Sequence, residues 1–161
     1  MQWKDVVTHP SLRDLPFKIE TNEWGQIVMT PARNKHGARQ FQIADLLNDL
    51  MQQSEQEGTT VTESAIQTTK GTKVADIAWY SLERWLIVED EFDASIAPEI
   101  CVEVLSPGNS TGEIDDKKAL YFAAGAHEVW VCYSDGGISF YGPQGKLTQS
   151  KLVPNFPKQI A

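Results

Sequence analysis

The chain has 161 residues and a formal net charge of −8, from 14 Lys and Arg against 22 Asp and Glu. This length predicts one domain over residues 1–161, with enough chain for a sizeable core. The acidic balance excludes a protein that grips duplex nucleic acid mainly through its overall charge, because such proteins carry a basic surface. Any nucleic-acid function must therefore depend on a local site.

The two cysteines, Cys101 and Cys132, each lie in an apolar, strand-like run. This placement indicates buried thiols rather than a zinc site or a disulfide framework. The first residues contain no apolar segment of the kind found in signal peptides. No run approaches the ~18 apolar residues of a membrane span. We therefore expect a cytoplasmic protein with no membrane association.

The first half of the chain predicts a turn region, a hairpin, a helix and further strands. Two prolines break residues 1–16, and a turn signal at residues 22–25 joins the strands of the hairpin. Apolar residues at helical spacing predict a helix over residues 32–53. Runs rich in Thr, Val and Ile favour strands in the remainder. The strands expected in this half cover residues 17–20, 26–30, 59–62, 65–69 and 74–80.

The second half alternates helices and strands. Ser81 is expected to cap a short helix, and Gly125 to end a longer one that begins at Ser110 or Thr111. We expect the tail to be extended over the surface. The whole order predicts one layered α+β domain. The segments are helices over 82–88 and 111–124, strands over 99–105, 128–133 and 138–141, and the tail over 148–161.

Two carboxylates stand inside apolar strand patterns. Asp76 lies within the run 74–80, and Glu103 lies between Val102 and Val104. An ionised carboxylate in such a place is costly unless it is paired, hydrogen-bonded or bound to metal. We expect both in a buried or cleft-facing site. The alternatives are a strand with one solvated face or a buried salt bridge.

Lys117 is a third polar residue in an apolar pattern. At about 100° per residue it shares one stripe of its helix with Ile114, Leu120 and Tyr121. Such a lysine either snorkels along the apolar surface or reaches a buried anion. Two inward carboxylates and one inward lysine would satisfy one another, so the three together predict a shared polar site.

This trio suits metal-assisted phosphodiester hydrolysis. Mg²⁺ and Mn²⁺ are hard cations that prefer oxygen ligands such as the carboxylates of Asp76 and Glu103. A bound metal lowers the pKa of its water and offsets transition-state charge. Lys117 would stabilise that charge or position the attacking water. Composition alone does not separate this activity from non-catalytic metal binding.

The same residues belong to four runs that resemble the Uma-two family of restriction endonuclease-like proteins, in the PD-(D/E)XK nuclease superfamily. The similarity spans about residues 16–145. It implies a restriction endonuclease-like core, in which helices flank a mixed central β-sheet, with an N-terminal β-hairpin. The runs are Val74-Ala75-Asp76-Ile77-Ala78-Trp79, Glu103-Val104-Leu105-Ser106-Pro107, Lys117-Lys118-Ala119-Leu120-Tyr121 and Gly125-Ala126-His127-Glu128-Val129-Trp130.

The resemblance implies a role for each matched position. Asp76 and Glu103 would be catalytic residues and metal ligands, and the carbonyl of Val104 would be a further ligand. Glu20 and His36 would border the site. The sequence departs from the family pattern at two positions. Ala75 replaces a proline, and Leu105 stands where the motif has its lysine; Lys117 matches a migrated position for that catalytic lysine.

The function implied is a Mg²⁺- or Mn²⁺-dependent endonuclease acting on DNA. The alternative is a catalytically silent interaction or regulatory module that keeps the nuclease fold, and a third reading is a hydrolase of small phosphorylated molecules. Related folds often pair, so we expect a homodimer. A basic rim near the first long helix is a further candidate, although a solvated face is the preferred interpretation. Its residues are Arg33, Lys35, Arg39, Lys70 and Lys73.

Overall fold

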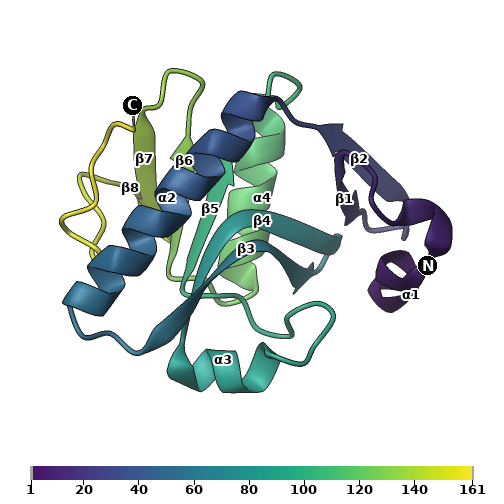
Figure 1. Cartoon of the computed structure of the whole chain (residues 1–161), viewed down its shortest axis with the longest axis horizontal. Coiled ribbons are helices and arrows are strands. Elements are labelled where there is room, and N and C mark those ends of the chain that lie inside the picture. Colours follow the sequence, from purple (N-terminus) through teal and green to yellow (C-terminus); the bar gives the residue numbers. More distant parts are fainter. Residues whose placement is uncertain (1, 161) are drawn as a thin grey trace.

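The computed structural model describes residues 2–160 and contains a six-stranded mixed sheet with a separate two-stranded hairpin (Figure 1). The order in the central sheet is β3-β4-β5-β6-β7-β8; β5 and β6 are parallel, and the other neighbours are antiparallel. The strands are β1 (Phe17–Thr21), β2 (Ile27–Pro31), β3 (Gly58–Thr68), β4 (Gly71–Ser81), β5 (Ile100–Val104), β6 (Glu128–Cys132), β7 (Ile138–Gly142) and β8 (Gly145–Leu147).

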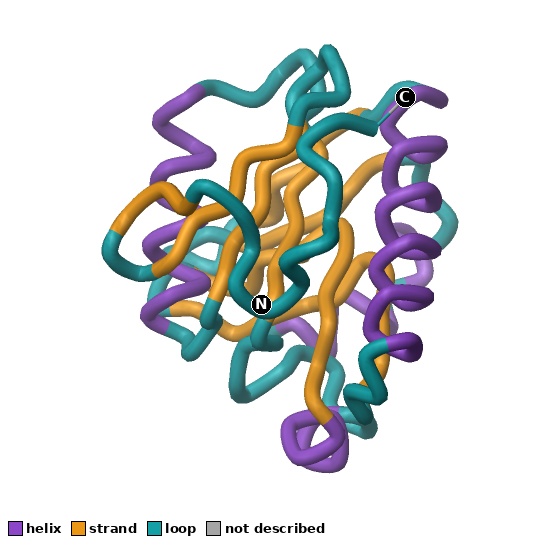
Figure 2. The backbone as a smooth tube through the Cα atoms, turned by 90° about the vertical axis from the view of Figure 1, so that its left-hand side faces the viewer, coloured by secondary structure: helices purple, strands orange, loops and turns teal. Residues whose placement is uncertain are grey.

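Helices cover the central sheet on two sides, as Figure 2 shows. On one side α2 packs Ile43, Leu47 and Met51 against the apolar faces of β4, β5 and β6. On the other side Tyr121 of α4 packs against Cys101 and neighbouring residues. The helices are α1 (Trp3–Thr8), α2 (Asn34–Gln53), α3 (Leu82–Val88) and α4 (Thr111–Ala123), with a short 3-10 turn at Pro10–Leu12.

The predicted α+β class, the mixed sheet flanked by helices and the N-terminal hairpin are confirmed. Ser81 and Ser110 cap α3 and α4 through hydrogen bonds from backbone N–H groups, as expected for serine before a helix. The two strands predicted over residues 59–62 and 65–69 belong, up to residue 68, to the single long strand β3, because β4 pairs with β3 along nearly its whole length. The turn region predicted over residues 1–16 contains α1, and β8 was not predicted.

The C-terminal tail differs from its prediction. Instead of lying extended over the surface, it buries Val153, Phe156 and Ile160 in the core cluster that α2 covers. The Phe156 ring lies 4.6 Å from the Trp130 ring, centroid to centroid. Aromatic pairs at this separation stabilise the fold by more than the apolar area they bury would predict. Prolines exclude regular secondary structure from the tail, but they do not exclude burial of its apolar side chains, so the predicted surface location is wrong.

The hairpin is joined to the central sheet at the start of β4. The hydroxyl of Thr21 accepts a hydrogen bond of 2.8 Å from the backbone N–H of Thr72. Gly71 begins β4 with φ +87°, and a Cβ at this position would lie 2.5 Å from the carbonyl oxygen of Asn22. Only glycine tolerates both this backbone conformation and this close approach. Gly71 therefore allows the hairpin to place β1 over the sheet.

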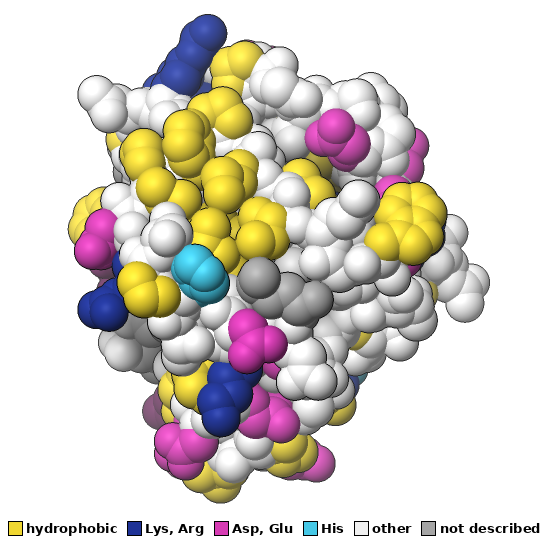
Figure 3. All heavy atoms as spheres, turned by 90° about the vertical axis from the view of Figure 1, so that its right-hand side faces the viewer, with side chains coloured by type: hydrophobic (Ala, Val, Ile, Leu, Met, Phe, Trp, Pro, Cys, Tyr) yellow, Lys and Arg dark blue, Asp and Glu magenta, His cyan; other side chains and the backbone are white. Residues whose placement is uncertain are grey.

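The two sides of β1 differ in polarity. Lys18 and Glu20 alternate with Phe17 and Ile19, so the polar pair faces the sheet. Figure 3 shows apolar side chains gathered on the face of the molecule where α1 and the hairpin lie. Phe17 and Met29 of the hairpin are each 42% exposed. The hairpin thus presents charged groups to the interior and apolar groups to solvent.

Within residues 2–160, no helix combines the length and the apolar character needed to cross a lipid bilayer.

Candidate active site

The two predicted carboxylates lie where the central sheet opens between β4 and β5. The pairing of these strands ends at Ile77 and Val102, so Asp76 and Glu103 occupy the next positions on the two strands. On the other side of β4, the pairing with β3 skips Glu63, whose φ is +53°. A positive φ is uncommon for a residue other than glycine. The β-ladder is therefore interrupted on both sides of Asp76.

Both carboxylates are buried, which excludes the alternative of a solvated strand face. Asp76 is 1% exposed and Glu103 is 3% exposed. Oδ2 of Asp76 accepts a hydrogen bond of 2.8 Å from the backbone N–H of Val104. The Tyr121 hydroxyl donates a hydrogen bond of 2.6 Å to Oε1 of Glu103. The structure thus shows Val104 contacting the site through its N–H, and its predicted role as a carbonyl ligand stays a prediction.

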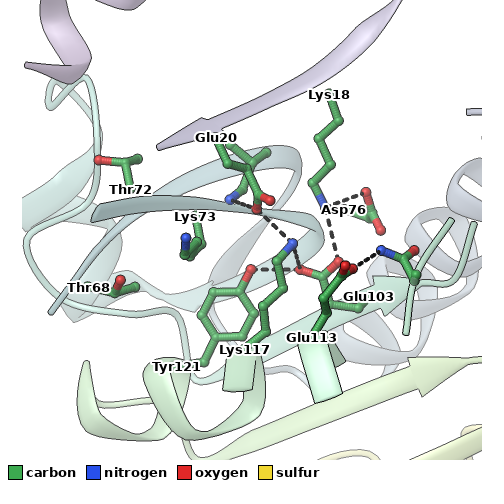
Figure 4. A network of polar contacts seen from close by, with 12 residues as sticks. Lys18, Glu20, Thr68, Thr72, Lys73, Asp76, Glu103, Glu113, Lys117 and Tyr121 are labelled. Atoms are coloured by element: carbon green, nitrogen blue, oxygen red, sulfur yellow. Dashed lines mark hydrogen bonds and ion pairs between the residues drawn. The ribbon is translucent and has the colours of Figure 1, made fainter. Parts of the chain in front are cut away.

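Lys18 of β1 connects the two carboxylates, as Figure 4 shows. Its Nζ lies 3.2 Å from Oδ1 of Asp76 and 3.0 Å from Oε2 of Glu103. Sequence reasoning missed this residue. Its only signal was the alternation that places it beside Glu20 on β1, and a lysine in a short hairpin strand is normally read as exposed.

Lys117 of α4 reaches the same cluster from the opposite side, and its prediction as an inward lysine is confirmed. Its Nζ lies 2.7 Å from Oε2 of Glu20 and 3.4 Å from Oε1 of Glu103. Glu20 also accepts a hydrogen bond of 2.7 Å from the backbone N–H of Val74. Glu20 therefore does more than border the site, because it holds the ammonium group of Lys117 beside Glu103.

His36 lies in the first turn of α2, near Asp76. Its Nε2 lies 3.4 Å from Oδ2 of Asp76. This contact raises the pKa of His36, while partial burial opposes the shift. The structure therefore places all five sequence-predicted residues, Asp76, Glu103, Lys117, Glu20 and His36, around one cluster. Together with Lys18 and Tyr121, we call them the carboxylate–lysine cluster.

The pKa values of the two carboxylates in this cluster are shifted in opposite directions. Burial would raise the pKa of Asp76, but Lys18, His36 and the Val104 N–H outweigh it and hold that pKa well below its usual range. Burial raises the pKa of Glu103 despite the opposing charges of Lys117 and Lys18. The pKa of Lys18 is well above its usual value, because the surrounding carboxylates outweigh the effect of burial. Asp76 is therefore firmly ionised, and Glu103 accepts a proton more readily.

The cluster already contains a cation between Asp76 and Glu103, which tests whether a metal fits. The ammonium group of Lys18 contacts an oxygen of each carboxylate. Within residues 2–160, no group of three or more His, Cys, Asp or Glu side chains has an arrangement that holds a metal ion. The oxygen donors suit Mg²⁺ or Mn²⁺. Asp76 and Glu103 are the residues that would hold such an ion, and their facing oxygens now contact the Lys18 ammonium group.

The comparisons with known proteins identify the family and the fold. Residues 13–160 match the model of the Uma2 family, described as "Putative restriction endonuclease". No curated protein matches the chain. A similar fold occurs in the crystal structure of a putative nuclease belonging to DUF820 from Anabaena variabilis ATCC 29413. The TM-score is 0.71 and the sequence identity 20%, over 89% of this chain and 80% of that chain.

Proposed function

Because the chain belongs to the Uma2 family, we propose that it is a metal-dependent endonuclease that hydrolyses DNA phosphodiester bonds. The observation that carries the proposal is the convergence of Asp76, Glu103 and Lys117 in one buried cluster. These residues come from three different elements, β4, β5 and α4, which the fold brings together. Buried, strongly perturbed ionisable groups gathered in this way are typical of catalytic sites.

In this proposal Asp76 and Glu103 hold Mg²⁺ or Mn²⁺. When bound, the ion lowers the pKa of a water molecule and offsets negative charge on the phosphoryl group. Lys117 lies beside Glu103, where its ammonium group can stabilise charge that develops on the phosphate. Glu20 positions Lys117 through the 2.7 Å ion pair. The Lys18 side chain would leave the two carboxylates to free their oxygens, while Glu20 on the same strand keeps its contact with Lys117.

A specific observation favours a second candidate, a catalytically silent module that keeps the nuclease fold. Lys18 and Lys117 already neutralise the carboxylates without any metal. Leu105 also stands where the motif has its lysine. A protein that uses the cluster only as a structural ion network would keep these pairs permanently closed.

A cleavage assay separates the two candidates. Supercoiled plasmid, linear duplex and single-stranded DNA are incubated with Mg²⁺ or Mn²⁺, and with EDTA as the metal-free control. We expect cleavage by the wild type that Asp76→Asn abolishes and that Lys117→Met lowers about 100-fold, the size of effect seen when one charge-stabilising donor is removed. Cleavage by Asp76→Asn at the wild-type rate would reject the assignment.

Calorimetric titration with Mn²⁺ gives a readout that does not depend on activity. The nuclease proposal expects binding by the wild type and none by Asp76→Asn. Absence of binding and of cleavage in the wild type, with the fold intact by circular dichroism, would favour the silent module. The predicted homodimer and cytoplasmic location stay predictions, and light scattering checks the first.

A further inference from the structure

A cleft of about 400 Å³ opens next to the carboxylate–lysine cluster. One wall is the start of α2, with Arg33, Lys35 and His36. The other walls are residues 104–107 and Asn109, at the end of β5 and in the loop that follows, and residues 133–134 after β6. This volume lies within the roughly 300–1,000 Å³ of sites that enclose a small ligand.

The charge of the cleft is opposite to that of the chain. Acidic residues outnumber basic residues by 22 to 14 overall, yet the lining contains Lys, Arg and His side chains and no Asp or Glu. A second cavity, of about 500 Å³ beside the hairpin, is lined by Glu23, Glu91 and Asp93. A cavity of about 370 Å³ at β7 and β8 is likewise lined, among the described residues, by lysines and by no Asp or Glu. The first cleft differs from it in sharing His36 with the carboxylate–lysine cluster, and its basic lining suits an anionic ligand.

The basic residues of the cleft fall into two groups. Arg39, predicted on an exposed rim, is buried instead, and its guanidinium donates hydrogen bonds of 3.0 and 2.6 Å to the carbonyls of Tyr133 and Ser134. It fixes one wall of the cleft. Arg33 and Lys35 are exposed. Among the described residues neither of them is in an ion pair. These two side chains are thus available to a ligand.

Two residues that line the cleft also contact Asp76, one of the proposed metal ligands. His36 lines it and lies 3.4 Å from Oδ2 of Asp76. Val104 also lines it, and its N–H donates to the same oxygen. A molecule held in the cleft therefore lies next to the end of the site that contains Asp76.

Part of the lining of the cleft is apolar. Leu105, Pro107 and Tyr133 line the cleft, and Tyr133 is 37% exposed. Position 105 is the one at which the motif lysine is missing. In this chain the apolar side chain of Leu105 lines the cleft and brings no charge to the cluster. Apolar and aromatic side chains of this kind bind the flat faces of nucleic-acid bases.

From these observations we propose that the cleft binds one nucleotide of a single strand, next to the scissile phosphodiester. Arg33, Lys35 and His36 contact its phosphate, and the base lies against Leu105 and Tyr133. A single strand bound through one short basic cleft suits a protein whose remaining surface is acidic, whereas duplex binding needs charge along a broad face. This inference deepens the proposed nuclease function and rests on it.

Binding without metal tests the inference apart from cleavage. Fluorescence anisotropy is measured in EDTA at low salt, with labelled dT6 and a labelled 12-base-pair duplex. We expect Arg33→Glu/Lys35→Glu to weaken dT6 binding by about tenfold or more, since loss of phosphate contacts reduces affinity steeply at low salt. The matched control is Lys146→Glu/Lys158→Glu, two exposed lysines that line a different cavity. It changes the net charge equally, and we expect less than a twofold effect.

Three results would overturn the inference: equal losses in both double variants, tighter binding of the duplex than of dT6 by the wild type, or no binding of either probe. Competition gives an independent measurement that needs no variant. We expect dTMP to displace dT6 at a lower concentration than inorganic phosphate does, and equal competition would reject the base-binding wall. Failure of cleavage with Mg²⁺ while dT6 binding responds as expected would reject the nuclease function and leave the cleft assignment standing.

Discussion

Two buried glutamates on the adjacent parallel strands β5 and β6 have different kinds of partner. Glu103 is 3% exposed and Glu128 is 2% exposed. Glu128 accepts hydrogen bonds from neutral donors, namely Trp130 Nε1 at 2.9 Å, Ser150 Oγ at 2.7 Å, and the backbone N–H groups of Lys151 and Leu152 at 3.0 and 2.9 Å. Glu103 is held by the ends of Lys18, Lys117 and Tyr121.

The difference lies in whether the partners can be exchanged. Two backbone donors and an indole are fixed by the fold, so Glu128 anchors the C-terminal tail to the sheet. Lysine side chains are long and rotatable, and their ammonium groups are point charges that another cation can replace. Burial of a carboxylate is therefore weak evidence for a functional site, whereas burial among replaceable cations is stronger evidence.

The largest effect expected from this comparison is on catalysis. Glu103→Gln keeps the shape of the side chain and removes its charge. We expect DNA hydrolysis to fall by about 1,000-fold or more, because a bound metal supplies several kcal/mol and each ~1.4 kcal/mol is a factor of ten. Glu128→Gln is the matched control and should leave the rate near that of the wild type at temperatures where it is folded. Similar rates for Glu103→Gln and the wild type would remove Glu103 from the site.

Glu128→Gln, which should leave the rate of hydrolysis unchanged, is expected to lower the stability of the fold. Glu128→Gln leaves one oxygen to accept where two accepted before, and it turns an amide NH₂ toward buried donors. We expect a loss of about 2–3 kcal/mol in the free energy of unfolding, the usual cost of breaking charged hydrogen bonds in a buried place. Urea denaturation measures this loss. A stability unchanged by Glu128→Gln would contradict the anchoring role.

A smaller effect is expected from removing a replaceable partner. Lys18→Met keeps the length of the side chain and removes the ammonium group that contacts both carboxylates. We expect the affinity for Mn²⁺ to rise about tenfold, which corresponds to ~1.4 kcal/mol. Lys70→Met is the matched control, because Lys70 pairs with Asp116 at the surface, 3.2 Å away. Affinity that is unchanged or weaker in Lys18→Met would show that Lys18 does not compete with a metal.

The contrast also explains what could be predicted from the sequence. Asp76 and Glu103 were recognisable because a charge inside an apolar strand pattern is anomalous, and Lys117 because it interrupts an apolar helix stripe. The family resemblance added Glu20 and His36. Hairpin, helices and sheet strands followed from periodicity and turn residues, which are local signals.

Features that depend on packing between distant segments were not predictable in this way. Lys18 contacts residues 58 and 85 positions away in the sequence, and its alternation with apolar neighbours in a short strand does not show what it contacts. Glu128 gave no distinct signal because its partners lie in the tail, which was expected on the surface. Both errors have one physical cause: the partner of a buried charge is set by tertiary contacts.

The smallest effect is the contribution of His36 to stability. Its hydrogen bond with Asp76 raises its pKa in the folded state, so the folded protein binds the proton more tightly than the unfolded chain, where a histidine has a pKa of about 6.5. The stabilisation is fully present below about pH 6.5 and is lost as the pH rises through the folded pKa. We expect the difference in unfolding free energy between wild type and His36→Gln to shrink as the pH rises from about 5.5 to 8.5. In an Asp76→Asn background the difference should no longer depend on pH in this way, because the partner that favours the charged ring is gone. A difference that stays constant with pH in the wild-type background would place His36 with fixed anchors such as Glu128 rather than with the exchangeable charges around Glu103.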